Sequence, residues 1–300
     1  MAVTDTGDII KVDFESGDTY GDSYDNAWNR QRVYDAIQTD GSIPNSVMEK
    51  KGNIYFMQDR ALHIGTENSN TYFFDDDGGA LVWQGSVDED YIFENKAYCK
   101  INGLTAITEI DDKRWGTRYG QEMEAVNIKL NGFYYVQLKS SNYKNYEFFG
   151  INFIGFYEGN TIKNGVHTGD PNGFDRVGYW IRGVEDIDNL QIINYIYGIW
   201  FDLSYFSGET TIENIQLIDC GYDTQYRLND KIGIINIVNS HIDTTSDIIG
   251  GTYQGAIATL NIQNYFQIYI QNAANASATL KDQNGNEIIS GTLDSEGKWL

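Results

Sequence analysis

Carboxylates are the side chains of this sequence with the greatest capacity for catalysis. The chain contains 43 Asp and Glu against 21 Lys and Arg, a net charge of −22. Enzymes that hydrolyse polysaccharides place two carboxyl groups about 5–10 Å apart across the scissile bond. Six acids lie where neighbouring strands could bring such a pair together: Asp170, Asp175, Glu185, Asp186, Asp188 and Glu213. Because so many acids form pairs by chance, none of them is assigned a catalytic role.

The densest acidic cluster could supply oxygen ligands to a calcium ion. It consists of Asp75–Gly79 (DDDGG), followed by Asp88–Asp90 (DED). Adjacent carboxylates suit Ca²⁺, but the spacing matches neither the EF-hand loop nor the glycine-aspartate nonapeptide repeat. A solvated turn is the preferred interpretation. Calcium is the one cofactor considered, and no other is predicted.

Histidine and cysteine give no sign of a catalytic or zinc site. Cys99 and Cys220 are far apart and belong to no CxxC motif, and Cys99 shares strand parity with Ile101, which predicts a buried thiol. His167, within HTGDPNG, is interpreted as a polar turn residue, and His63 is expected to face outward. No GxSxG motif or phosphate-binding glycine loop is present. The sequence therefore predicts no catalytic, cofactor-binding or metal-binding residue, and the balance is against an enzyme.

Charge and hydropathy exclude several classes of partner. A nucleic-acid-binding protein needs a basic surface, which a chain of net charge −22 lacks. No segment approaches the roughly 20 apolar residues of a membrane span. The first residues, MAVTDTGDIIKVDF, lack the basic and apolar regions of a signal peptide. We therefore expect synthesis in the cytoplasm, without membrane insertion.

Four similar segments indicate the architecture that positions these residues. They are NLQIIN (189–194), NIQLID (214–219), INIVN (235–239) and LNIQN (260–264). Each reads apolar, polar, apolar, any residue, then Asn or Asp, and the central apolar residues are Ile192, Leu217, Ile237 and Ile262. Side chains alternate across a strand, so both apolar residues face one side. A strand-sized unit repeated every 20–25 residues is typical of a solenoid. The predicted fold class is all-β, a single-stranded right-handed parallel β-helix.

Three segments are predicted along the chain. Residues 1–50 form an N-terminal arm and cap, with a helix over Asp25–Gln38 that Asp25 or Asn26 caps; a strand is the alternative. Residues 51–270 form the β-helix, and residues 271–300 form a β-hairpin segment resembling an incomplete β-sandwich.

Apolar pairs at positions i and i+2 extend the repeat towards the N-terminus. The reference residues are Ile64, Trp83, Ile101, Ile128 and Phe153. The next interval, from Phe153 to Ile192, is too long for one coil. It contains the turn-rich segment Glu158–Arg176, which we interpret as an insertion in preference to a further coil around Val177–Ile181.

One apolar stripe is predicted on the outside of the coils. It comprises the residues that follow the second apolar position of the repeat: Ile154, Ile193, Ile218 and Val238. The neighbouring segment Tyr195–Phe206 adds exposed aromatic residues, including Trp200. Such a surface favours a subunit interface, with loop cover second and a sugar-stacking platform third.

The chain resembles structural β-helix proteins of tailed bacterial and archaeal viruses. The resemblance rests on the start MAVTDTGDI, the segment NIYFMQDRALHIGTENSNTYFFDDD, the NLQIIN and NIQLID coils and the ending ATLKDQNGNEIISGTLDSEGKW. The ending also resembles the first hairpin of a carboxypeptidase-regulatory-like or Ig-like module. The resemblance implies a non-enzymatic virion protein, such as a tail spike, tail fibre, tip or capsid decoration protein. It also implies a homo-oligomer, with a trimer favoured, other virion proteins as partners and contact with cell-surface carbohydrate. The alternatives are a polysaccharide depolymerase on the same scaffold and an adhesin-like β-helix at a cell surface.

Overall fold

The protein consists almost entirely of short strands, and it divides into two compact units, Met1–Ile262 and Gln263–Leu300. Each unit is described by itself. A computed structural model describes residues 3–13, 20–65, 71–75, 77–96, 98–116, 122–155, 159–171, 175–183, 185–202, 208–227, 232–240, 257–263, 268–269, 277–281, 287–292 and 298–299.

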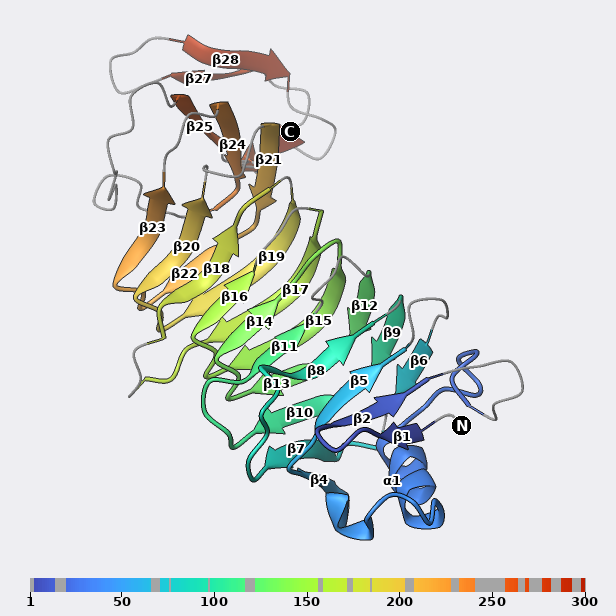
Figure 1. The fold of residues 1–300 in the computed structure, drawn as a ribbon. Helices are drawn as coiled ribbons and strands as arrows, with labels where there is room; N and C mark the ends of the chain where they lie inside the picture. Colours follow the sequence, from blue (N-terminus) through green and yellow to red (C-terminus); the bar gives the residue numbers. More distant parts are fainter. Residues whose placement is uncertain are drawn as a thin grey trace. The chain divides into compact units, whose positions relative to one another are not determined.

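The first unit contains a ten-stranded sheet, here called sheet A, in which successive strands of the chain's coils pair in parallel (Figure 1). Its antiparallel edge strand is β1 (Val3–Asp5). The others, in order, are β2 (Ile9–Val12), β5 (Ala61–Ile64), β8 (Tyr91–Asn95), β11 (Arg114–Gly116), β14 (Tyr135–Gln137), β16 (Phe153–Gly155), β18 (Val177–Ile181), β20 (Tyr197–Asp202) and β23 (Tyr222–Arg227).

The second sheet is bent into two faces, here called face B and face C. Face B contains β6 (Thr71–Phe74), β9 (Cys99–Asn102), β12 (Met123–Val126), β21 (Gly208–Glu213) and β24 (Ile232–Val238). Face C contains β4 (Ile54–Gln58), β7 (Ala80–Gln84), β10 (Thr105–Thr108), β13 (Lys129–Asn131) and β22 (Gln216–Ile218). Three strands run through both faces: β15 (Asn142–Phe149), β17 (Thr161–Thr168) and β19 (Asp186–Ile193). Beyond β24, the strand β25 (Ile257–Gln263) ends the sheet order. Each coil thus passes through sheet A, face B and face C, which confirms the predicted parallel β-helix.

A ladder of asparagines forms the corner between faces B and C. Asn127, Asn145, Asn164, Asn189, Asn214 and Asn239 all have a φ between 48° and 60°. Asn tolerates this left-handed conformation better than most residues. The side-chain amide of Asn189 donates to Asn164 Oδ1 at 2.9 Å, and that of Asn164 donates to Asn145 Oδ1 at 3.0 Å. Stacked amides therefore satisfy one another along this edge of the solenoid.

The repeat was predicted correctly for two of its four segments. Ile192 and Leu217 are register neighbours on face C. The prediction is wrong for Ile237, which pairs with Ile212 on face B. The reason is that Asp219 ends face C and Asn239 ends face B, and both have a positive φ. Because faces B and C both end at an Asn or Asp with a positive φ, strands of the two faces match the same sequence template. Asn264, which closes the fourth segment, lies outside the described residues.

The predicted insertion at Glu158–Arg176 is wrong. Strand β17 lies inside it and pairs with β15 and β19, and β18 follows as the next strand of sheet A. The segment is therefore one further coil. Its strand was missed because its inward positions include the polar residue His167, which pairs in register with Ile192.

The N-terminal segment is part of the β-helix. Strand β2 pairs with β5, so this part is not the predicted arm. The predicted helix is present as α1 (Arg30–Thr39), but its N-cap is Asn29, whose side chain accepts from the Arg32 N–H. Helix α1 lies beside β3 (Met48–Lys51) and the 3₁₀ helix Asn45–Val47. Its residues Val33 and Ile37 are buried in the core, which supports the predicted role of a cap. Among the described residues, no helix has the length and apolar character to cross a bilayer.

The second unit contains two antiparallel strand pairs. The predicted hairpin is present as β27 (Ser277–Lys281) and β28 (Glu287–Thr292). The other pair joins β26 (Ile268–Tyr269) to β29 (Lys298–Trp299).

Candidate functional site

Two tryptophans stack on the outer side of sheet A. Strand β18 reads Val-Gly-Tyr-Trp-Ile and strand β20 begins Tyr-Gly-Ile-Trp-Phe, with Trp180 and Trp200 as register partners. Alternation buries Tyr179 and Ile199 in the core and leaves both tryptophans partly exposed. Their rings are parallel within 7°, with centroids 4.3 Å apart. Trp200 therefore covers one side of Trp180.

A glycine lies on the other side of Trp180. Gly155 is its register partner on β16, and Gln137 on β14 is the partner of Gly155. The φ of Gly155 is +124°, and a Cβ there would lie 2.4 Å from the Trp180 carbonyl oxygen. Only glycine fits this position. Since Gly155 carries no side chain, a slot remains between Trp180 and Gln137, two coils apart or roughly 10 Å at the usual strand spacing.

A pocket of about 290 Å³ occupies this region. It is lined by Tyr91, Arg114, Tyr134, Tyr135, Gln137, Phe153 and Trp180. The Phe153 ring is 5.7 Å from Tyr134 and 6.4 Å from Trp180, measured between centroids. The lining is therefore mainly aromatic, with one amide and one guanidinium.

The polar groups of the pocket include two nitrogen donors, Gln137 and Arg114. The Tyr91 hydroxyl donates to Gln137 Oε1, which orients the amide, and its NH₂ group is a donor. The Arg114 guanidinium lies 5.6 Å from the Tyr91 ring centroid, and its side chain is 38% exposed. The nearest acid to Arg114 is Asp90, at 3.8 Å. The pocket therefore combines stacking surfaces with positive charge.

A second arginine supports Trp180. The Arg182 guanidinium lies 5.2 Å from the Trp180 ring centroid, and its Nε is 3.5 Å from a carboxylate oxygen of Asp202. Asp202 is fully buried. This ion pair joins the two tryptophan-bearing strands and fixes the wall of the pocket.

The acids considered from the sequence lie elsewhere. Glu185 faces the interior, and burial raises its pKa to about 8. Asp188 and Glu213 are register neighbours on face B. Asp186 pairs with Lys163 at 3.2 Å, on the same face. Asp175 accepts a hydrogen bond from the Asp170 N–H at 2.6 Å, in the turn after β17. None of these acids lines the pocket.

The histidines have structural positions. His167 is not a turn residue: it is buried in β17, with Nε2 2.9 Å from the Tyr146 hydroxyl and Nδ1 2.7 Å from the Gly178 carbonyl oxygen. Burial lowers the pKa of His167 to about 3, so the ring stays neutral. His63 is 3% exposed, beside Glu94, and is not a solvent-facing residue. Cys99 is buried as predicted, and both cysteines are free thiols.

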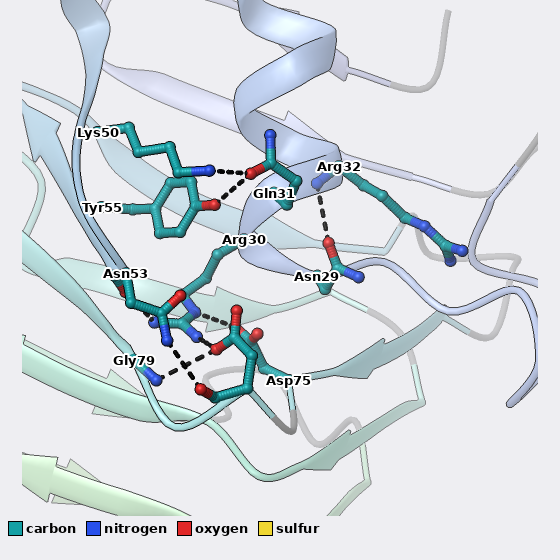
Figure 2. Close-up of polar contacts among 10 residues, drawn as sticks. Asn29, Arg30, Gln31, Arg32, Lys50, Asn53, Tyr55, Asp75 and Gly79 are labelled. Carbon is teal, nitrogen blue, oxygen red and sulfur yellow. Dashed lines mark hydrogen bonds and ion pairs between the residues drawn. The ribbon is translucent and has the colours of Figure 1, made fainter.

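The acidic cluster at Asp75–Gly79 binds an arginine. The buried Arg30 guanidinium pairs with both Asp75 and Asp77 and donates to the Asn53 carbonyl oxygen at 3.1 Å (Figure 2). The backbone N–H of Gly79 donates to Asp77 at 3.1 Å. Within the described ranges, no group of three or more acidic, histidine or cysteine side chains could hold a metal ion. The cluster therefore fixes α1 to the first coils.

The predicted outer stripe is wrong as a set. Ile154 is fully buried in sheet A and Val238 is 5% exposed on face B. Only Ile193 and Ile218 are neighbours, on face C. Their column does form an outer ridge that is apolar at six of its eight positions, with different members: Phe56, Val82, Ile107, Asn131, Phe149, Thr168, Ile193 and Ile218. This error has the same cause as the error at Ile237, because residues from three different faces were assigned to a single column.

Sequence reasoning identified Trp200 but missed Trp180, Gly155, Gln137 and Arg114. A signal was available for Trp180, because Gly178 and Trp180 repeat as Gly198 and Trp200 twenty residues later. The other three come from strands of only three residues, β11, β14 and β16, which carry too little pattern to reveal a common face.

Comparison with known proteins gives two distant matches among solved structures. No family model and no curated protein matches the chain. Among solved structures, the catalytic unit of a thermostable GH87 α-1,3-glucanase from Streptomyces thermodiastaticus is 11% identical, with a TM-score of 0.39, over 88% of this chain and 69% of that one. The periplasmic alginate epimerase AlgG is 9% identical, with a TM-score of 0.26, over 86% of each chain. Identities and TM-scores this low carry no argument about this chain, and the fold is established by the strand register.

Proposed function

We propose that this β-helix binds an extended polysaccharide along the outer face of sheet A. The observation that carries the proposal is the slot above Gly155, part of a pocket that Trp180, Phe153 and Gln137 help to line. The apolar face of a pyranose ring packs well on an indole, and Gln137 and Arg114 can donate to its hydroxyl oxygens. One sugar would occupy the slot, and its neighbours would follow the coils over Tyr134 and Phe153.

The pocket supports binding without cleavage. Hydrolysis of a glycosidic bond requires two carboxyl groups about 5–10 Å apart. Among the described residues that line the pocket there is no carboxylate, and Asp202, the buried acid behind Trp180, is paired with Arg182. A depolymerase is therefore the second candidate.

Such a protein would attach a particle or a cell to a glycan-coated surface. We keep the virion as the proposed location, with the cell surface as the alternative, and a homo-oligomer as the proposed assembly. Several parallel copies in one assembly would bind a glycan surface with higher affinity than a single copy, because the second binding event becomes intramolecular.

The test is an oligosaccharide array followed by calorimetry, with Trp180→Ala as the variant. Loss of a central tryptophan costs about 2 kcal/mol or more of binding free energy, so affinity should fall roughly 30-fold. The matched control is Phe149→Ala, an aromatic that is 46% exposed on face C, which should bind as the wild type does. Unchanged binding by Trp180→Ala, or no bound glycan at all, would refute the proposal. Release of reducing ends by the wild type would replace it with the depolymerase.

A further inference from the structure

We infer that the glycan bound in this pocket carries a carboxylate, as hexuronic acids do. The inference rests on the proposed glycan binding and adds the chemical class of the ligand. The partner of the carboxylate is the Arg114 guanidinium.

Arg114 gives the pocket a charge opposite to that of the protein. Of the lining residues that the structure describes, it is the only one charged at neutral pH, in a chain of net charge −22. A surface so acidic repels anionic polymers along most of its area. A single cation among aromatic rings therefore selects where an anionic chain can bind.

Arg114 is also less neutralised than the arginines beside it and at the N-terminus. Arg182 faces the fully buried Asp202, and Arg30 holds both Asp75 and Asp77. In contrast, Arg114 has only Asp90 at 3.8 Å, and the Asp90 side chain is 69% exposed. The Arg114 Nε is buried and has no hydrogen-bond partner within the described part of the chain. A half-exposed guanidinium whose ion pair is this long can accept a carboxylate of a ligand as an additional partner.

The neighbouring groups agree with an acceptor ligand. Because the Tyr91 hydroxyl donates to Gln137 Oε1, the orientation of the amide is set, and its NH₂ group can donate to a ligand in the pocket. Two donors, Arg114 and Gln137, thus line the same pocket as Trp180. A carboxylate on the glycan accepts from Arg114, and its ring or hydroxyl oxygens accept from Gln137.

The test compares acidic oligosaccharides with their neutral counterparts. An array would carry galacturonates, glucuronates and mannuronates beside their methyl esters, and the best acid and its ester would be titrated by calorimetry at low and physiological salt. We expect the wild type to bind the acid about tenfold or more tightly than the ester, because a charged hydrogen bond is stronger than a neutral one. Arg114→Gln should bind both forms equally. Lys129→Gln on face C removes the same charge far from the pocket and should retain the preference.

The outcomes separate this inference from the proposed function. Equal binding of acid and ester by the wild type, with both lost in Trp180→Ala, overturns the carboxylate and leaves glycan binding intact. A preference that survives in Arg114→Gln overturns the role of Arg114. If the wild type binds none of the acids or esters, and no other glycan on the array, the proposed function fails as well.

Discussion

Strand β18 separates two aromatic clusters that lie back to back. Tyr179 points inward, to a group of polar and aromatic side chains in the core, and Trp180 points outward, to the pocket. The two residues are adjacent in the chain and have similar chemistry. Their environments differ, and this difference decides their roles.

The inner cluster satisfies its own hydrogen bonds. The Tyr179 hydroxyl donates to Glu185 Oε2 at 2.5 Å, and Asn160 donates to Glu185 Oε1 at 3.4 Å. His167 is bonded to Tyr146 on the same side of the sheet. Burial keeps Glu185 protonated and His167 neutral near pH 7. Tyr179, Glu185 and His167 are all buried away from solvent, so this cluster is structural.

The outer cluster lines a pocket. Arg114 and Gln137 line it together with Trp180, and Gly155 adds no side chain of its own. The titratable Glu185 and His167 are buried away from this pocket, so aromatic residues and a glycine, and not an acid or a histidine, mark the candidate site.

The largest expected effect is on the inner cluster, through Glu185→Gln. The pKa of Glu185 is about 8 in the folded protein against a usual 4.5. Between these values the folded state keeps a proton that the unfolded state loses, so the free energy of unfolding falls as pH rises from 4.5 to 8. The total loss is roughly 3–5 kcal/mol. Gln stays neutral, so the variant should match the wild type at pH 5 and be more stable at pH 9.

Denaturant titrations at pH 5, 7 and 9 measure this difference. Glu147→Gln serves as the control, because Glu147 is exposed on face C and pairs only with Lys129. Parallel stability curves for Glu185→Gln and the wild type would show that Glu185 does not titrate between these pH values. The contrast drawn here between the inner and outer clusters would then be wrong for the inner cluster.

A smaller effect is expected for Tyr179→Phe. The change removes the hydroxyl that donates to Glu185, and leaving a buried acceptor without its donor costs about 1–3 kcal/mol. Glycan binding should not change, because Trp180 keeps its position on the other side of the sheet. Urea unfolding and glycan titration of the same sample test both statements. Lost binding at unchanged stability would mean that the two clusters act as one site.

The smallest effect is expected for Ile218→Gln on the ridge of face C. Ile218 is 38% exposed, so a polar substitution should alter the free energy of unfolding by less than about 0.5 kcal/mol. Glycan binding should stay at the wild-type value. A change in the mass of the protein in solution, measured by light scattering, would instead assign the ridge to the proposed homo-oligomer.

Much of the fold could be predicted from local sequence. Alternating apolar residues with Asn and Gly at the corners predicted stacked strands, and Ile192 and Leu217 gave the correct period. The N-terminal helix and the hairpin over residues 277–292 were also predicted. These features depend on alternation and on turn chemistry, which neighbouring residues in the chain determine.

The placement of each strand on its face was decided only by tertiary structure. All three faces have the same alternation, and two corners use Asn or Asp with a positive φ. Ile154, Ile193 and Val238 therefore looked equivalent, although they lie on three different faces. The pocket depends on this placement, because Trp180, Gly155 and Gln137 come from three successive coils. Alternation sets which side of a strand a residue faces, but only the pairing of strands a coil apart sets which residues become neighbours.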